Sequence, residues 1–215
     1  MDKNIIYSVI ISVIFSYLLG SLNSSIVVVR LWKKVDIRDF GSNNAGLTNT
    51  LRVFGKGPAA ATLICDLAKG VIAVFAGRLI GYLFGVDNTL LIGYFAGVAA
   101  FLGHIFPIYY GFKGGKGVLM SATTLLALDP LTFAIVIPFF ALVLYLSRYV
   151  SLSSICAAVA YPIVTYFAQS ARDFECPLVN AGFALFICVI IIVMHKANIE
   201  RLMNGTENKF SFNKK

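Results

Sequence analysis

Charged residues are scarce in this sequence. Only 13% of its 215 residues are Asp, Glu, Lys or Arg, whereas 59% are hydrophobic. A soluble domain carries about 25% charged residues, so this composition excludes an ordinary water-soluble fold. The mean hydropathy of +0.84 and several long apolar runs indicate that lipid surrounds the chain.

The apolar runs lack the strict alternation of a transmembrane β-barrel, because they are continuous. We therefore expect an all-α integral membrane protein, a helix bundle forming a single polytopic domain over residues 1–215. No cleavable signal peptide is expected, since the first apolar run continues to about Val29 without a small-residue cleavage site.

Cysteine is also sparse, and none of the four residues forms a CxxC pair. They are Cys65, Cys156, Cys176 and Cys188. Three lie in apolar runs, where cysteine acts as a small hydrophobe, so neither disulfides nor zinc are expected. The ten acidic residues are scattered, so the sequence predicts no metal site and no cofactor.

About seven transmembrane helices are expected. The apolar segments run from about 4–29, 58–84, 89–110, two within 118–146, 151–169 and 178–194. A single helix over 118–146 would be about 43 Å long, well beyond a hydrocarbon core of about 30 Å. Because proline disfavours a helical residue before it, Asp129-Pro130 splits this run into short fourth and fifth helices.

The net charge of +8 follows a positive-inside pattern rather than indicating a nucleic-acid partner. With the N-terminus outside and the C-terminus cytoplasmic, only Lys3, Lys69, Arg78 and Arg172 fall outside cytoplasmic loops, which leaves 14 of the 18 basic residues inside. A cell (plasma) membrane location follows. The cytoplasmic loops that hold the three polar motifs lie at about 30–57, 111–117 and 195–215, and the motifs are expected to converge on one site.

The first motif combines glycines, asparagines, small hydroxyls and one arginine. It reads Gly41-Ser42-Asn43-Asn44-Ala45-Gly46-Leu47-Thr48-Asn49-Thr50-Leu51-Arg52. Glycine lets the backbone approach a ligand closely, successive N–H groups can cradle an oxyanion, and Arg52 can bind a phosphate bidentately. The same residue types also suit an ordinary polar turn.

The second motif is Gly103-His104-Ile105-Phe106-Pro107, followed by Phe112-Lys113-Gly114-Gly115-Lys116-Gly117. Glycines and a lysine directly before a helix suit phosphate binding, because the helix N-terminus favours anions. The spacing is not that of a Walker A loop. A basic turn at the membrane surface is the alternative interpretation.

The third motif, His195 to Glu207, places His195, Asn198 and Arg201 near one helical face if the last helix continues. An amphipathic tail is the alternative. Ser151, Ser153 and Ser154 open the sixth span, where serines are usually caps but one can contact substrate. Asp66 and Lys69 lie inside the second span, as an ion pair or as functional groups.

Together the three motifs resemble those of the bacterial acyl-phosphate-dependent glycerol-3-phosphate acyltransferase family. That family shows GSGN-x-G-x-TN-x-x-R, GH-x-x-P with F-x-GGKG, and H-x-x-NI-x-RL-x-x-G-x-E, in this order. The match runs from the first helix to the tail. Asn43 departs from the pattern, because glycine is usual there. No H-x4-D acyltransferase motif and no G-x-S-x-G elbow occurs.

The resemblance implies transfer of an acyl group from acyl phosphate to the 1-hydroxyl of glycerol 3-phosphate, giving 1-acylglycerol 3-phosphate and phosphate. An acyl phosphate is already activated, so neither a metal nor a covalent nucleophile is needed. The expected catalytic residues are His195, Asn198, Lys116 and Ser154. The expected phosphate-binding residues are Ser42, Asn44, Thr48, Asn49, Arg52, Gly114, Gly115, Gly117 and Arg201. The base is either His195 or a substrate phosphate oxygen.

A transporter or channel for phosphate or an organic anion is the rival from another class, and a structural membrane subunit is a third. A transporter predicts two similar halves with binding groups near the midplane, and the sequence shows no such repeat. The expected partners are glycerol 3-phosphate, acyl phosphate and the lipid bilayer. The sequence does not indicate the acyl-chain preference or the oligomeric state.

Overall fold

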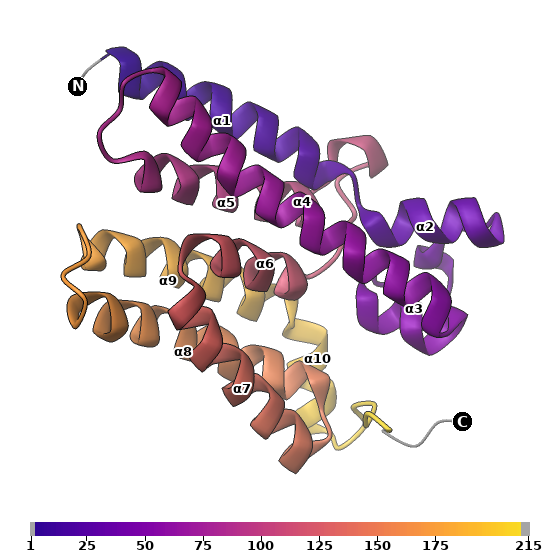
Figure 1. Ribbon diagram of the computed structural model, residues 1–215. Coiled ribbons are helices and arrows are strands. Elements are labelled where there is room, and N and C mark those ends of the chain that lie inside the picture. Colours follow the sequence, from indigo (N-terminus) through magenta and orange to yellow (C-terminus); the bar gives the residue numbers. More distant parts are fainter. Residues whose placement is uncertain (1–2, 212–215) are drawn as a thin grey trace. The chain divides into compact units, whose positions relative to one another are not determined.

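The computed structural model describes residues 3–211, and all the regular structure within that range is helical (Figure 1). The helices are α1 (Lys3–Ser21), α2 (Ser24–Lys33), α3 (Leu47–Phe54), α4 (Lys56–Leu83), α5 (Thr89–Ile105), α6 (Val118–Leu128), α7 (Pro130–Ser147), α8 (Val150–Ser170), α9 (Pro177–Met194) and α10 (Lys196–Met203), with 3-10 turns η1 (Ile37–Asp39) and η2 (Ile108–Tyr110). The all-α prediction is confirmed.

Six segments within residues 3–211 are long and apolar enough to cross a membrane. They are Lys3–Lys33, Lys56–Leu83, Thr89–Tyr110, Pro130–Ser147, Val150–Ser170 and Pro177–Met194. Helix α6 has only 11 residues, about 16 Å at the usual rise per residue, or about half of a hydrocarbon core. Seven spans therefore stay a prediction that depends on how α6 meets the bilayer.

The predicted single first helix is wrong, because the chain breaks between α1 and α2. Asn23 is fully buried, and its side-chain oxygen accepts a hydrogen bond from the Ile26 N–H, which caps α2. An asparagine side chain competes in this way with the helical bonding of its own backbone. The amide of Asn23 also donates to the Ala45 carbonyl, 3.3 Å away.

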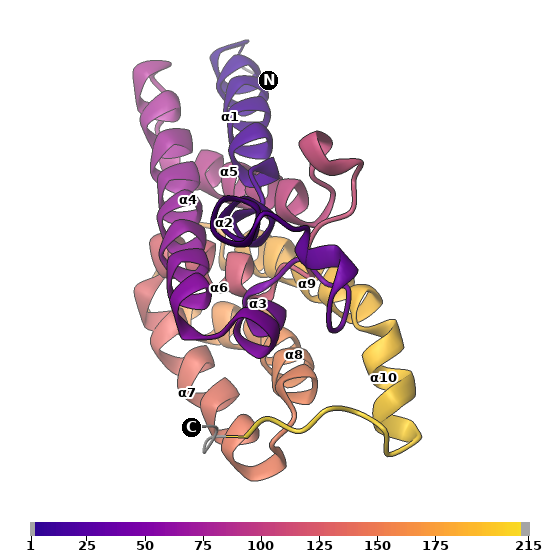
Figure 2. The same cartoon turned by 90° about the vertical axis from the view of Figure 1, so that its right-hand side faces the viewer.

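The chain divides into two compact units, Met1–Leu128 and Asp129–Lys215, where a single domain was expected. In the first unit α1 packs against α4 and α5, and α6 packs against α4 and α5 (Figure 2). The α1–α5 contact is close because Gly20 faces the Ala100 backbone and Gly103 faces the Tyr17 backbone, where a Cβ atom would collide. Small residues permit such approaches between membrane helices.

In the second unit α7, α8 and α9 pack in sequence order, and α10 contacts α8 and α9. The predicted break at Asp129-Pro130 is confirmed, because α6 ends at Leu128 and α7 begins at Pro130. The Asp129 carboxylate caps α7 through the Thr132 N–H and also accepts from Arg172 and Gln169. This buried carboxylate is therefore satisfied from three directions.

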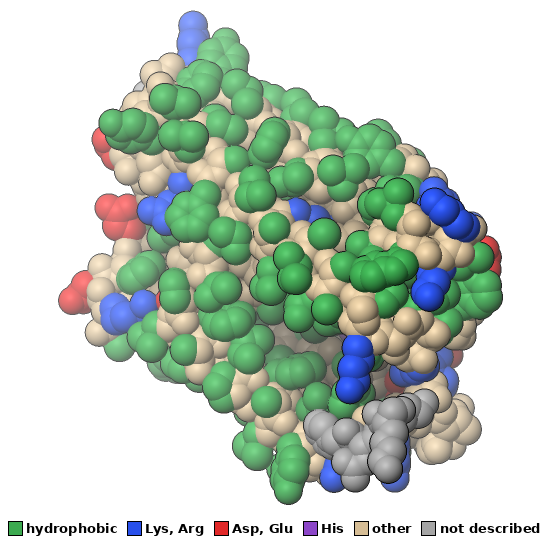
Figure 3. All heavy atoms as spheres, turned by 45° about the vertical axis from the view of Figure 1, so that its right-hand side comes forward, with side chains coloured by type: hydrophobic (Ala, Val, Ile, Leu, Met, Phe, Trp, Pro, Cys, Tyr) green, Lys and Arg blue, Asp and Glu red, His purple; other side chains and the backbone are tan. Residues whose placement is uncertain are grey.

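Hydrophobic side chains dominate the face shown in Figure 3. Large apolar residues are widely exposed on the long helices, including Tyr82 at 72%, Leu146 at 72% and Leu178 at 73%. Water does not tolerate apolar surface on this scale, so lipid is the medium that these helices face.

Candidate functional site

The first polar loop, residues 41–46, is organised by one buried side chain, Asn49 of α3. Its carboxamide oxygen accepts from the Ser42 N–H at 3.0 Å. Its NH₂ group donates to the carbonyls of Phe40 at 2.9 Å and Asn44 at 3.1 Å. Asn49, predicted to bind phosphate, therefore holds the backbone of the loop in shape.

Two residues of this loop have left-handed backbone conformations. Gly41 has a φ of 62° and Asn43 a φ of 57°. Asparagine tolerates this region better than other residues with a side chain, which explains how Asn43 can stand where the family usually has glycine. The Asn43 amide also donates to the Arg38 carbonyl at 2.8 Å.

The other predicted residues of the first motif are accessible. Ser42 and Arg52 are exposed, whereas Asn44 and Thr48 are half-buried. Thr48 and Arg52 are four residues apart on α3, so they share one face of that helix. A hydroxyl and a guanidinium on one face are groups that can bind a phosphate together.

The glycines of the second motif, residues 112–117, pack against the end of α5. The N–H groups of Gly114 and Gly115 donate to the carbonyls of Ile105 at 3.0 Å and His104 at 3.1 Å. A Cβ atom at Gly115 would collide with the His104 ring and the Ala45 carbonyl. Gly114 and Gly115 were predicted to bind phosphate, but their N–H groups are not available for it, since both already donate to the protein.

Lys116 is half-buried, and it is followed by Gly117, whose φ of 80° turns the chain into α6. Lys113, three residues earlier, is exposed. A Cβ atom at Gly117 would collide with the Phe101 ring. The glycines thus place Lys116 at the start of α6, where the positive end of the helix dipole also favours an anion.

Arg38, which precedes the first loop, connects it to the segment that holds the second loop. Its guanidinium donates to the Tyr110 carbonyl at 2.8 Å and the Lys113 carbonyl at 3.3 Å, while Asp36 accepts two hydrogen bonds from it. Hydrogen bonds from Arg38 outweigh the effect of burial and lower the pKa of Asp36, and the same pair raises the pKa of Arg38. Both groups therefore stay charged at neutral pH.

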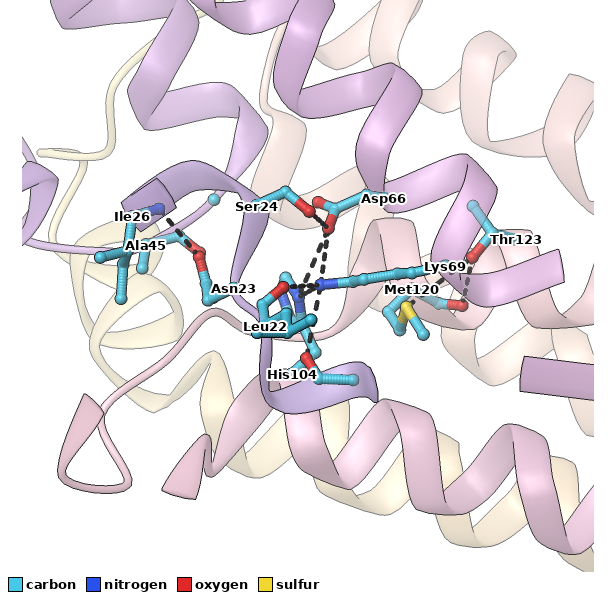
Figure 4. A network of polar contacts seen from close by, with 12 residues as sticks. Leu22, Asn23, Ser24, Ile26, Ala45, Asp66, Lys69, His104, Met120 and Thr123 are labelled. Atoms are coloured by element: carbon cyan, nitrogen blue, oxygen red, sulfur yellow. Dashed lines mark hydrogen bonds and ion pairs between the residues drawn. The ribbon is translucent and has the colours of Figure 1, made fainter. Parts of the chain in front are cut away.

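A buried polar cluster lies behind the two loops (Figure 4). Asp66 and Lys69 form an ion pair at 2.8 Å, with side chains 1% and 6% exposed. Lys69 Nζ also lies 3.2 Å from His104 Nδ1, and Ser24 donates to Asp66 at 2.7 Å. Asp66 and Lys69 thus form the ion pair that the sequence left as one of two alternatives, and the sequence did not indicate that His104 joins it.

The third motif lies in the second unit. His195 is buried where α9 meets α10, and its Nδ1 lies 2.8 Å from the Ile191 carbonyl. A carbonyl oxygen only accepts, so Nδ1 carries the proton, and Nε2 of the neutral ring is an acceptor. The conditional prediction that the helix continues is partly right, because α10 follows α9 with a change of backbone conformation at His195 itself.

Glu207 gathers three other residues of this unit. It accepts from Asn198 at 2.8 Å, Arg201 at 2.6 Å and Ser151 at 3.0 Å. Burial raises the pKa of Glu207, but these hydrogen bonds lower it by more, so the net pKa lies below its ordinary value. The sequence contained Glu207 at the end of the third motif, yet nothing in its spacing showed what it would bind.

The serine at the start of α8 that joins this network is Ser151. Ser154, the serine predicted to be catalytic, is buried, and its hydroxyl donates to the Val150 carbonyl of its own helix at 2.8 Å. Ser153 makes the equivalent bond to Tyr149. Such bonds back to the preceding turn are common for serine in membrane helices.

Comparison with known proteins identifies the family. A family model described as Glycerol-3-phosphate acyltransferase matches residues 10–205. The chain belongs to the glycerol-3-phosphate acyltransferase family. The family predicted from the three motifs is thereby confirmed.

Relatives named glycerol-3-phosphate acyltransferase align over nearly their whole length. The protein from Clostridioides difficile (strain 630) is 40% identical, with 95% of this chain and 96% of the relative covered. That from Chlorobaculum tepidum is 36% identical, covering 94% and 97%.

Solved structures agree with this glycerol-3-phosphate acyltransferase assignment. The crystal structure of PlsY (YgiH), an integral membrane glycerol 3-phosphate acyltransferase, in its glycerol 3-phosphate form, matches with a TM-score of 0.81 and 33% identity, covering 95% of this chain and 96% of that one. A second form of PlsY, with lysophosphatidic acid, matches with a TM-score of 0.78, 32% identity and the same coverage. The chain is therefore a membrane enzyme of the PlsY type.

Proposed function

We propose that this enzyme transfers an acyl group from an acyl phosphate to the 1-hydroxyl of glycerol 3-phosphate, the first acylation of phospholipid synthesis. The hydroxyl oxygen attacks the acyl carbonyl carbon, and the bond from that carbon to the phosphate oxygen breaks. The products are 1-acylglycerol 3-phosphate (lysophosphatidic acid) and inorganic phosphate. The proton of the attacking hydroxyl passes to the released phosphate or to the solvent.

The observation that carries the proposal is the contact between the two glycine-bearing loops of the first unit. Gly115 of the second loop lies against the Ala45 carbonyl of the first, and Arg38 holds the second loop through two carbonyls. The first loop leads to Thr48 and Arg52, and the second ends at Lys116. Two adjacent anion-binding elements suit a reaction in which donor and acceptor each carry a phosphate.

We assign roles on this basis. Ser42, Asn44, Thr48 and Arg52 bind one phosphate, and Asn49 positions their loop. Lys116 neutralises the second phosphate or the charge that develops on the reacting oxygen. Gly114 and Gly115, whose N–H groups donate to the protein, position Lys116 rather than bind phosphate, and Gly117 turns the chain from Lys116 into α6. The PlsY structures with glycerol 3-phosphate and with lysophosphatidic acid support the choice of acceptor and product.

In the second unit, His195 and Asn198 orient the acceptor hydroxyl. The Nδ1–H of His195 donates to Ile191, so Nε2 is the nitrogen that accepts a hydrogen bond from that hydroxyl. Glu207 holds Arg201 and Asn198 in place, and Ser151 of α8 joins the same carboxylate. The active site lies on the cytoplasmic face of the plasma membrane, with the N-terminus outside.

The test is turnover by the purified protein in detergent with radiolabelled glycerol 3-phosphate. Acyl phosphate and acyl-CoA are supplied as donors in parallel reactions, each with and without EDTA. We expect labelled lysophosphatidic acid from acyl phosphate alone, and the same rate in EDTA. An equal or faster reaction with acyl-CoA would refute the proposed donor.

A further inference from the structure

The Asp66–Lys69–His104 cluster places ionisable groups where they are costly. Asp66, Lys69 and His104 are each at most 5% exposed and lie on apolar helices. Replacing a buried ion pair by apolar residues often leaves stability unchanged or raises it. In addition, Asp66 Oδ2 is buried without a hydrogen-bond donor among residues 3–211. The cluster is therefore not explained by stability alone.

Lys69 fixes the break between α1 and α2. Its ammonium donates to the Leu22 carbonyl at 3.1 Å and the Gly20 carbonyl at 3.4 Å. Gly20 is in the last turn of α1 and Leu22 follows that helix, where the helix dipole is negative and a cation is favoured. Ser24, the first residue of α2, is held by Asp66, so the ion pair holds both sides of the break.

The same break leads directly to the first phosphate loop. Asn23 lies between Leu22 and Ser24, and its amide donates to the Ala45 carbonyl (Figure 4). The position of Ala45 therefore depends on Asn23, whose backbone is fixed on both sides by the ion pair. A chain of contacts thus runs from Lys69 to the first loop.

His104 extends the cluster to the second loop. An ammonium only donates, so His104 Nδ1 accepts from Lys69 and the proton of the neutral ring is on Nε2. The ring lies beneath Gly115 so closely that a Cβ atom there would collide with it. The His104 carbonyl also accepts from the Gly115 N–H, and Lys116 is the next residue.

We infer that Asp66, Lys69 and His104 are positioning residues that set the spacing of the two phosphate-binding loops, and thereby the affinity for glycerol 3-phosphate. This inference rests on the proposed function of those loops. The cluster reaches the first loop through Asn23 and the second through Gly115. Neither Lys69 nor His104 needs to touch substrate for this role.

The test compares Lys69→Met, the double variant Asp66→Asn/Lys69→Met, His104→Gln and the control Arg78→Met. Arg78 lies on the same helix, nine residues from Lys69, and is half-buried beside the Phe75 ring. Each purified protein is measured for thermal midpoint, for equilibrium binding of radiolabelled glycerol 3-phosphate, and for KM and kcat. The binding measurement does not depend on the donor.

We expect Lys69→Met to lower the thermal midpoint and to weaken glycerol 3-phosphate binding at least tenfold. The double variant leaves no unpaired buried charge, so it should recover the thermal midpoint, but not the affinity, because the contacts with Gly20 and Leu22 are still missing. His104→Gln should also weaken binding and raise KM, whereas Arg78→Met should change neither.

The inference would be overturned if His104→Gln and the double variant both bound glycerol 3-phosphate with wild-type affinity. It would also be overturned if the double variant recovered both the thermal midpoint and the affinity. If Lys69→Met does not fold, these two variants still decide the outcome. A wild-type protein that binds glycerol 3-phosphate but does not use acyl phosphate would refute the proposed donor alone.

Discussion

Arg201 and Glu207 form an ion pair across the turn that ends α10, with Nε 2.6 Å from Oε2. The other carboxylate oxygen accepts from Asn198 of α10 and Ser151 of α8. One carboxylate therefore fixes the third motif and joins it to the start of α8. Because three donors share it, its loss leaves three polar groups without this acceptor.

Glu207→Gln should lower kcat/KM by about 10- to 100-fold. Hydrogen bonds to a charged group contribute about 1.5–3 kcal/mol, and each 1.4 kcal/mol is a factor of about ten in rate. The matched control is Glu200→Gln, since Glu200 is exposed on α10, the helix that precedes Glu207, and should change little. Equal effects of the two substitutions in steady-state assays would contradict the role given to Glu207.

The pH dependence of stability should follow the lowered pKa of Glu207. A carboxylate whose pKa is depressed on folding stabilises the folded protein fully above its ordinary pKa of 4.5, and this contribution is lost as the pH falls through the folded value. The difference in thermal midpoint between wild type and Glu207→Gln should stay constant from about pH 8 to about pH 5 and shrink at lower pH. A difference in thermal midpoint that grows as the pH falls would contradict a pKa of Glu207 that is lowered on folding.

Lys116→Ala and Lys113→Ala should differ sharply. Lys116 is half-buried before α6, whereas Lys113 is exposed. Removing one strong oxyanion donor costs about 2.7–4 kcal/mol, or about 100- to 1000-fold in turnover. An exposed charge contributes much less. Turnover of both folded variants measures this, and near-normal activity of Lys116→Ala would remove that lysine from the mechanism.

His195→Asn should lower kcat by about 10²- to 10⁴-fold, the contribution typical of a positioned acid–base group. Asparagine can still donate to the Ile191 carbonyl, as His195 Nδ1 does, but it lacks an acceptor in the place of Nε2. His195→Gln, whose longer side chain reaches further, should retain more activity. The hydroxyl-orienting role of Nε2 would be wrong if His195→Asn kept wild-type kcat.

The C-terminal segment should be inaccessible from outside the cell. This prediction rests on the positive-inside rule, because 14 of the 18 basic residues fall in loops assigned to the cytoplasmic side. A cysteine introduced by Asn208→Cys in a background without native cysteines should react with an impermeant thiol reagent only after permeabilisation. Ser8→Cys is unsuitable as a control, because Ser8 is buried; Glu175→Cys, exposed before α9, should react in intact cells.

The local sequence determined the helical elements and several of their ends. Continuous apolar runs form helices because only helices satisfy their own backbone in lipid, and Asp129-Pro130 ended one helix and capped the next. The glycines at 41 and 117 stand where φ is positive, as their chemistry predicts. The order of the three motifs also indicates the family.

Tertiary structure decided which polar groups meet. The break at Asn23 was not predicted, because long apolar stretches continue on both sides of Ser21-Leu22-Asn23-Ser24-Ser25 and the Asn23 amide donates to a distant acceptor, the Ala45 carbonyl. The contact between Lys69 and His104 spans 35 residues, and that between Ser151 and Glu207 spans 56. Hydrophobic periodicity specifies which face of a helix is buried, but the partner of a buried polar group is fixed by how helices distant in sequence pack together.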